Sequence, residues 1–208
     1  KFLVIGNPIE HSLSPELHNY WIKNNGINAI YEKQKLNENE LEQIISKVKD
    51  KKINGVNVTV PFKKKIIPYL DELSFEAQST QSVNTIYLKD NKVIGHNTDI
   101  FGFETSIKKS DYNLNNKEVL ILGAGGVVSS IIFALIKMKV SKIKICNRTK
   151  EKAENLKTFY KNLEIIKWGE VSNFDIIINA TSLGLKKEDN LNLDFSSTVK
   201  NKLFYDVI

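Results

Sequence analysis

Lys63 is the residue whose type and position best suit a proton transfer. It follows the strand-like segment 55–60 and Pro61, and Lys64 and Lys65 come directly after it. Lysines are disfavoured in the first turn of a helix, where the helix dipole is positive. We interpret Lys64 and Lys65 as solvated surface lysines. For Lys63 we favour a functional role, because a lysine at a helix N-terminus beside a cleft can donate and accept a proton.

Two polar side chains lie just before Lys63. Alternation along a strand predicts that Val56, Val58 and Val60 lie in the core. Asn57 and Thr59 then face the other way, near the end of the strand, where open α/β sheets bind ligands.

Ser12 and Ser14 lie where the strand-like segment 2–6 leads into a helix expected at 15–25. Ser14 followed by Pro15 is a favourable N-cap and first-turn pair, which gives Ser14 a structural role. The same helix end can also bind an anion, and Ser12 would add a second hydroxyl. Two hydroxyls at a helix N-terminus suit a substrate carboxylate.

Asn84 and Asp99 lie in two further polar clusters, at 82–85 and 95–99. Asn and Asp in such places form turns and helix caps more often than they bind ligands. Asp99 is accordingly a candidate cap for the helix that follows it. Spacing alone does not bring Asp99 close to Lys63.

A metal site is not expected. His11 and His18 are separated along the chain and have no third ligand nearby, so we expect ordinary hydrogen-bonded histidines. The single cysteine, Cys146, excludes an internal disulfide and a cysteine-based metal cluster. A lone cysteine fits the reducing cytoplasm, which is the expected location.

A glycine-rich turn follows the apolar segment 118–122. Its residues are Gly123, Ala124, Gly125, Gly126 and Val127. Glycines between a strand and a helix let the backbone approach a pyrophosphate, which the free amides and the helix dipole then hold. The third glycine position of the dinucleotide fingerprint is Val128, so the motif is incomplete, and a turn without a ligand is the alternative.

The next strand ends in Asn147, Arg148 and Thr149, with Lys152 close behind. An NAD enzyme presents Asp or Glu to the ribose hydroxyls at this place. A guanidinium instead grips a 2′-phosphate with two parallel hydrogen bonds, whereas a carboxylate would repel it. We therefore predict NADP rather than NAD. The alternative is that Arg148 is a surface cation.

The charge balance is basic, with 30 Lys plus Arg against 24 Asp plus Glu and a net charge of +6. The lysines are spread along the chain, and no aromatic stacking motif or zinc finger accompanies the one tight basic run, 63–65. We expect no nucleic-acid partner. The longest apolar stretch, 127–136, is about half the ~20 residues that a membrane span needs, so no membrane span is expected.

Apolar runs and helical patterns alternate along the whole chain, which is typical of βα units and a mostly parallel sheet. We expect strands at 2–6, 29–35, 55–60, 85–88, 92–95, 118–122, 142–146, 163–166, 175–179 and 203–207. We expect helices at 15–25, 38–49, 99–109 and 126–138, and one beginning near Lys63. The polar stretch 110–117 looks like a domain junction.

Seven segments together resemble the shikimate dehydrogenase family: GNPIxHSLSP, GVNVTVPFK, SVNT, GxNTD, GAGG, NRT and NATSxG, in the family's order from Phe2 to Val207. Three departures stand out. Val127 and Val128 replace the small residues usual after GAGG, Leu183 with Leu185 alters the NATSxGM ending, and Gln81 with Ser82 replaces Gly-Ala before VNT. The family continues well beyond the position of Ile208, and Lys1 stands where an initiator Met belongs. We therefore expect a C-terminally truncated member.

The resemblance implies a two-domain α/β fold. Residues 1–100 would form an open, mostly parallel βα substrate domain, and residues 101–208 a Rossmann NADP-binding domain that is incomplete at its C-terminus. The implied substrate contacts are Ser12, Ser14, Asn57, Thr59, Lys63, Asn84 and Asp99. The implied catalytic pair is Lys63 and Asp99. The implied cofactor residues are Gly123 to Val127, Asn147, Arg148, Thr149, Lys152, Ala180, Thr181 and Ser182.

The implied reaction is the reversible NADPH-dependent reduction of 3-dehydroshikimate to shikimate, with a homodimer left open. A quinate/shikimate dehydrogenase with looser substrate and cofactor choice is the rival enzyme. A catalytically silent nucleotide-sensing module on the same fold is the rival of another class. The presence of both Lys63 and Asp99 favours the enzyme.

Overall fold

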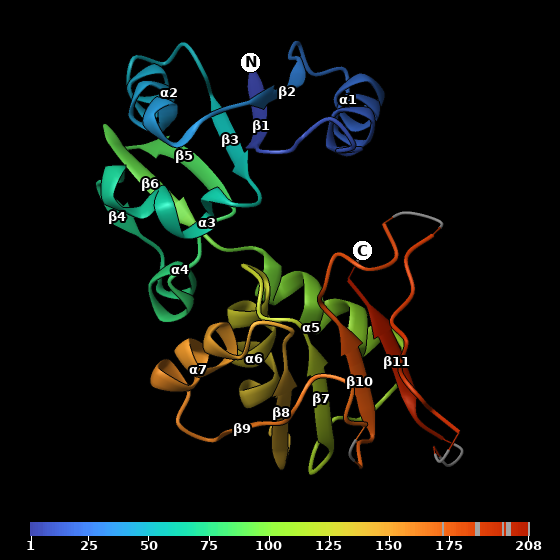
Figure 1. Ribbon diagram of the computed structural model, residues 1–208. Helices are drawn as coiled ribbons and strands as arrows, with labels where there is room; N and C mark the ends of the chain where they lie inside the picture. The colour runs from blue at the N-terminus through green and yellow to red at the C-terminus, as the bar shows by residue number, and fades with distance from the viewer. Residues whose placement is uncertain (172, 186–187, 197, 199–200, 208) are drawn as a thin grey trace. The chain divides into compact units, whose positions relative to one another are not determined.

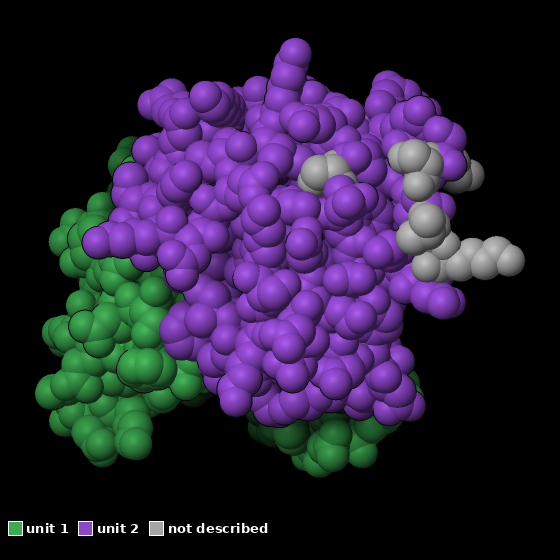
Figure 2. Space-filling view, turned by 90° about the horizontal axis from the view of Figure 1, so that it is seen from below, with its two compact units in different colours: residues 1–100 green, residues 101–208 purple. Residues whose placement is uncertain are grey.

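The computed structural model describes residues 1–171, 173–185, 188–196, 198 and 201–207. The chain divides into two compact units, Lys1–Ile100 and Phe101–Ile208, which Figure 2 shows in two colours. Each unit contains one β-sheet with helices, so the α/β fold class is confirmed (Figure 1).

Unit 1 holds a six-stranded sheet in the order β2-β1-β3-β5-β6-β4. Its strands are β1 (Phe2–Gly6), β2 (Tyr31–Lys35), β3 (Gly55–Val58), β4 (Glu72–Leu73), β5 (Thr85–Lys89) and β6 (Lys92–His96). Its helical segments are α1 (Ser14–Asn24), η1 (Glu38–Glu40), α2 (Leu41–Lys49), α3 (Phe62–Lys65), η2 (Ile67–Tyr69) and α4 (Phe75–Thr80). The sheet is parallel except for β5, which runs antiparallel to both of its neighbours.

The core of unit 1 forms because apolar residues recur at helical spacing in α2 and at alternate positions in the strands. All four apolar residues of α2 are buried, namely Leu41, Ile44, Ile45 and Val48. They join a cluster that includes Val56 and Val58 of β3. The expectation that Val60 also lies in the core is wrong, since its side chain is 56% exposed. β3 ends at Val58, so strand alternation no longer applies two residues later.

Unit 2 holds a five-stranded sheet, entirely parallel, in the order β11-β10-β7-β8-β9. Its strands are β7 (Glu118–Leu122), β8 (Lys142–Cys146), β9 (Leu163–Ile165), β10 (Ile176–Asn179) and β11 (Leu203–Asp206). Its helices are α6 (Val128–Lys137) and α7 (Lys150–Phe159), and α5 (Asp99–Lys109) begins in unit 1 and ends in unit 2. The central strand β7 is continuously apolar after Glu118 and buried, as is typical of a parallel strand covered on both faces.

Several predicted elements match the structure residue for residue, namely 2–6, 99–109, 118–122 and 142–146. Among the strands and α-helices of the described residues, three were not predicted: β4, α4 and α7. Helix α7 had a usable signal, because Ala153 and Leu156 are three residues apart and both are buried. Among the described residues, no helix is long and apolar enough to cross a membrane.

Candidate functional site

The topology of unit 1 brings three chain segments together at one edge of its sheet, meaning the edge formed by the ends of the strands and not an outer strand. Parallel strands β3 and β6 end at this edge, and the reversed strand β5 begins there. Lys63 follows β3, Asn84 precedes β5, and Asp99 follows β6. The register pairs Thr85 with both Asn57 and His96, which fixes the segments against each other.

Lys63 and Asp99 form an ion pair at this edge. The Lys63 Nζ atom lies 2.6 Å from the Asp99 Oδ2 atom, and the side chains are only 13% and 19% exposed. Lys63 belongs to the short helix α3, whose backbone is tied to the segment before β5 because the carbonyl of Lys63 accepts the N–H of Val83. The structure therefore places together two residues that spacing alone could not.

Asn84 completes the arrangement around Asp99. Its Nδ2 atom donates to Asp99 Oδ1 at 2.7 Å, so each carboxylate oxygen has one partner from this site. The Oδ1 atom of Asn84 accepts the backbone N–H of Thr98 at 2.9 Å. Thr98 was not singled out from the sequence, although it lies inside the same polar cluster as Asp99.

Asp99 does not cap the helix that it begins, so that expectation is wrong. The Oδ1 atom of Asn97 accepts the N–H of Asp99 at 3.0 Å and satisfies one of the free donors of the helix start. Asn97 is 1% exposed, and its amide donates to Thr80 Oγ1 and to the carbonyl of Ser82. Because Asn97 supplies the cap, the carboxylate of Asp99 remains available to Lys63.

Ser12 and Ser14 lie at the start of α1. The expectation that Ser14 is the N-cap is wrong: Leu13 occupies that position, and Ser14 is the first helical residue. Ser12 Oγ accepts the N–H of Ser14 at 3.3 Å, which gives one free donor of the helix start a partner. Both serines are half-buried.

Asn57 and Thr59 lie at the end of β3, as expected. The Asn57 amide group donates to the carbonyl of Asn84 and to Thr85 Oγ1, and its oxygen accepts from the hydroxyl of Tyr31 at 2.6 Å. A side chain at Gly6 would place its Cβ 2.6 Å from Thr59 Cγ2, so the chain passes this close only because residue 6 is glycine.

The glycine-rich turn of unit 2 lies where the strand order reverses, between β7 and β10. Gly123 has φ +104°, and a Cβ there would lie 2.7 Å from the carbonyl oxygen of Ala180. Gly125 and Gly126 are exposed. This is a backbone cradle at the carboxyl ends of parallel strands, and it fits the pyrophosphate of a dinucleotide.

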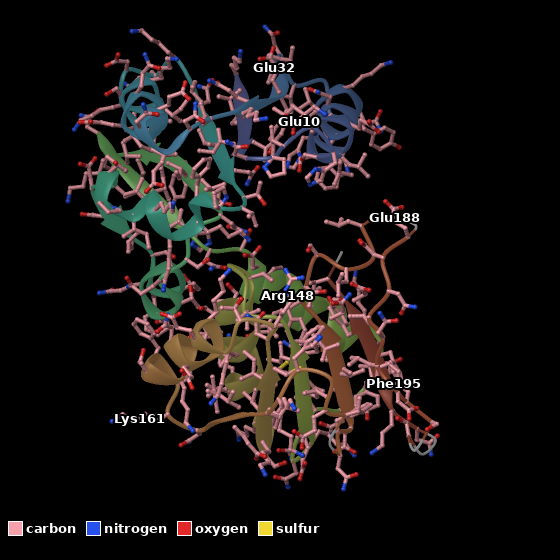
Figure 3. The ribbon with its side chains drawn as sticks, in the orientation of Figure 1. Glu10, Glu32, Arg148, Lys161, Glu188 and Phe195 are labelled. Carbon is pink, nitrogen blue, oxygen red and sulfur yellow. The ribbon has the colours of Figure 1, made fainter. Side chains whose placement is uncertain are left out.

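The basic residues expected at a 2′-phosphate follow β8, the next strand. Arg148 and Lys152 are exposed, and Figure 3 labels Arg148 above β8. The Asn147 amide donates to the carbonyl of Thr149 at 2.7 Å, which shapes the turn that carries Arg148. The residues present therefore fit a phosphorylated ribose.

The turn after β10 carries Thr181, which is shaped by Asn179. The Asn179 Oδ1 atom accepts both the N–H and the hydroxyl of Thr181, at 3.1 and 2.7 Å. Asn179 also donates to the carbonyl of Leu183, and Ser182 is exposed. This turn packs against the cradle, because Ala180 is the residue that Gly123 approaches.

Fold and site define a two-unit α/β protein with a dinucleotide-type turn in one unit and a lysine–aspartate pair in the other. Among the described residues, no group of three His, Cys, Asp or Glu side chains could hold a metal ion. Residues 4–86 match the model of the shikimate dehydrogenase substrate binding domain, and residues 105–206 match that of shikimate / quinate 5-dehydrogenase.

The shikimate dehydrogenase (NADP(+)) of Pelagibacter ubique is 61% identical over 207 residues, covering 100% of this chain and 78% of the relative. The crystal structure of the Aquifex aeolicus shikimate dehydrogenase has a TM-score of 0.91 at 39% identity, covering 100% of this chain and 78% of that one. A Thermus thermophilus shikimate 5-dehydrogenase in complex with NADP(H) and shikimate has a TM-score of 0.87 at 29% identity, covering 99% and 77%. The chain belongs to the shikimate dehydrogenase family.

Proposed function

We propose that this chain catalyses the reversible NADPH-dependent reduction of 3-dehydroshikimate to shikimate. The observation that carries the proposal is the ion pair of Lys63 and Asp99, held by Asn84 at the edge of the unit 1 sheet. Family membership supports the reaction, because the relatives are named as NADP(+)-dependent shikimate dehydrogenases.

On the substrate side, residues of this chain would donate and accept the proton of the reaction. Reduction of a ring carbonyl leaves negative charge on its oxygen, and the Lys63 ammonium can stabilise that charge and donate a proton to it. Asp99 orients Lys63 and can accept a hydrogen bond from a substrate hydroxyl. Ser12 and Ser14 would hold the substrate carboxylate, and Asn57, Thr59 and Asn84 the ring hydroxyls.

On the cofactor side, residues of unit 2 would bind and orient the coenzyme. NADPH supplies the hydride when bound, and the protein supplies position and charge. The cradle from Gly123 to Val127 would hold the pyrophosphate, and Arg148 with Asn147, Thr149 and Lys152 the 2′-phosphate. The turn of Ala180, Thr181 and Ser182 would line the nicotinamide side.

We propose the cytoplasm as the location, since Cys146 is buried and unpaired. A homodimer stays a prediction that sedimentation velocity tests.

The test is the appearance of NADPH absorbance when the purified protein receives NADP+ and shikimate, with quinate and NAD+ in parallel reactions. We expect turnover with shikimate and NADP+ at least tenfold faster than with either replacement. Equal rates with shikimate and quinate would instead identify a quinate/shikimate dehydrogenase. No turnover with any pair would identify a silent nucleotide-binding module.

A further inference from the structure

Tyr31 is a buried residue that touches the proposed substrate site through one hydrogen bond. It is the first residue of β2 and is 4% exposed. Its hydroxyl donates to Asn57 Oδ1 at 2.6 Å, across the sheet from β2 to β3. No motif of the sequence pointed to this residue.

The bond to Tyr31 decides which way the amide of Asn57 points. The hydroxyl of Thr85 donates its proton to Asn84 Oδ1 at 3.0 Å, so it can only accept from Asn57 Nδ2. The carbonyl of Asn84 also accepts from the same nitrogen. The oxygen of Asn57 must therefore face Tyr31. That oxygen has two lone pairs, and one of them accepts the hydrogen bond from the Tyr31 hydroxyl. The second lone pair is left for a donor outside this network.

Residues of helix α1 also contact Tyr31 and hold its backbone and ring in place. The Asn19 side chain brackets its backbone, accepting the Tyr31 N–H at 2.9 Å and donating to the Tyr31 carbonyl at 2.8 Å. The His18 ring stacks on the phenol ring, with centroids 4.1 Å apart and planes at 13°. His18 Nδ1 donates to the carbonyl of Ser14 at 2.9 Å, because a carbonyl can only accept. One chain of contacts thus runs from Ser14 to Asn57.

The hydroxyl of Tyr31 keeps its proton under assay conditions. Burial raises the pKa of Tyr31 to about 12, because the phenolate would lose its hydration. Tyr31 is therefore a permanent donor to Asn57 at neutral pH.

We propose that Tyr31 is a positioning residue, which locks the Asn57 amide so that its oxygen can accept a hydrogen bond from a substrate hydroxyl. This proposal rests on the proposed function. Tyr31 also connects the helix that carries Ser14 to the strand that carries Asn57. The proposed substrate contacts of Ser14 and Asn57 therefore both depend on Tyr31. The residue itself touches no reacting atom.

Tyr31→Phe tests the proposal, because it keeps the ring and its stacking and removes only the donor. We expect the KM for shikimate to rise about tenfold, the scale of one lost hydrogen bond, while kcat and the KM for NADP+ change less than threefold. Tyr160→Phe is the matched control. Burial raises the pKa of Tyr160 to about 12 as well, but its hydroxyl donates to the carbonyl of Ser129 in unit 2. It should leave the KM for shikimate unchanged.

A double-mutant cycle separates positioning from general destabilisation. With Asn57→Ala in place, Tyr31→Phe should change the KM for shikimate by less than twofold, since there is no amide left to position. The same tenfold rise in both backgrounds would overturn the proposal, as would an unchanged KM in Tyr31→Phe alone. Absence of shikimate turnover by the unmodified protein would instead overturn the proposed function, and this proposal with it.

Discussion

Lys63 shows how much one side chain depends on its surroundings. Three consecutive lysines follow Phe62 in the same short helix, yet their environments differ. Lys63 is mostly buried against Asp99, whereas Lys65 pairs with Glu38 at the surface. An ammonium held in a partly desolvated pair is well placed to stabilise a developing alkoxide, and an exposed one is not.

Lys63→Ala should lower kcat by about three orders of magnitude, because it removes the proposed proton donor and leaves Asp99 without its counter-charge. The KM for NADP+ should change little, since the proposed cofactor cradle belongs to unit 2. Steady-state rates with shikimate and NADP+ measure both. Lys65→Ala is the control and should retain full activity. A loss of less than tenfold in Lys63→Ala would remove Lys63 from the reaction.

Arg148 is the only arginine among 30 basic residues. In a chain that uses lysine almost everywhere, the one guanidinium lies on the turn after β8, where its planar fork can hold a phosphate. Its role in NADP binding stays a prediction.

Arg148→Leu should raise the KM for NADPH more than tenfold and the KM for NADH less than twofold, because only NADPH carries the 2′-phosphate. Initial rates with each coenzyme give the two constants. Lys161→Leu, an exposed cation beyond α7 that Figure 3 also labels, should change neither. Equal effects of Arg148→Leu on both coenzymes would contradict the assignment.

At the scale of elements, the direction of β5 assembles the unit 1 site. If β5 ran parallel to its neighbours, Asn84 would lie at the opposite edge of the sheet from Lys63 and Asp99. Sequence patterns predicted β3, β5 and β6 themselves, because apolar alternation and turn residues are local signals. The ion pair depends on the pairing of strands far apart in the chain, which no local signal encodes. Tyr31 and Asn97 were missed for the same reason.

Asp175 joins the beginnings of three strands in unit 2. Its carboxylate accepts the N–H of Glu118, its N–H donates to the Glu118 carbonyl, and its own carbonyl accepts from Leu203. The backbone hydrogen bond from Glu118 lowers the pKa of Asp175, and Lys202 and Lys117 lower it further. Ordinary strand pairing is thus reinforced by a charge at the start of β10.

Asp175→Asn should therefore destabilise the protein at neutral pH and much less in acid. The folded-state pKa lies below the unfolded value of about 3.9, so the unfolded chain binds the proton first as the pH falls. The contribution of the carboxylate is complete above about pH 5 and is lost towards the lower, folded-state pKa. Urea unfolding from pH 7 to pH 3 should show the gap between the two proteins narrowing. A gap that stays constant with pH would contradict this account.

At the scale of the whole molecule, the proposed substrate residues all lie within residues 1–100, and the proposed cofactor residues within 101–208. Each set is built on its own sheet, at the edge where parallel strands end.

Hydrogen exchange followed by mass spectrometry should distinguish the proposed substrate residues from the proposed cofactor residues. NADP+ should slow exchange chiefly in the turns at 123–128 and 147–152, and shikimate chiefly around residues 57–63 and 84–99, since bound ligand stabilises the state that binds it. The free protein and the protein with NAD+ are the controls. Protection by NADP+ confined to residues 1–100 would contradict the division of roles.

The turn at Gly123 tolerates no side chain, whereas Arg148 is exposed on a turn of its own. In the proposed assignment, cofactor affinity and cofactor preference would thus rest on positions with opposite freedom to vary. Under that assignment, substitutions at residues 147–152 would exchange one coenzyme for the other without disturbing the proposed pyrophosphate cradle, which serves both coenzymes. Both positions lie outside residues 1–100, which hold all the proposed substrate residues.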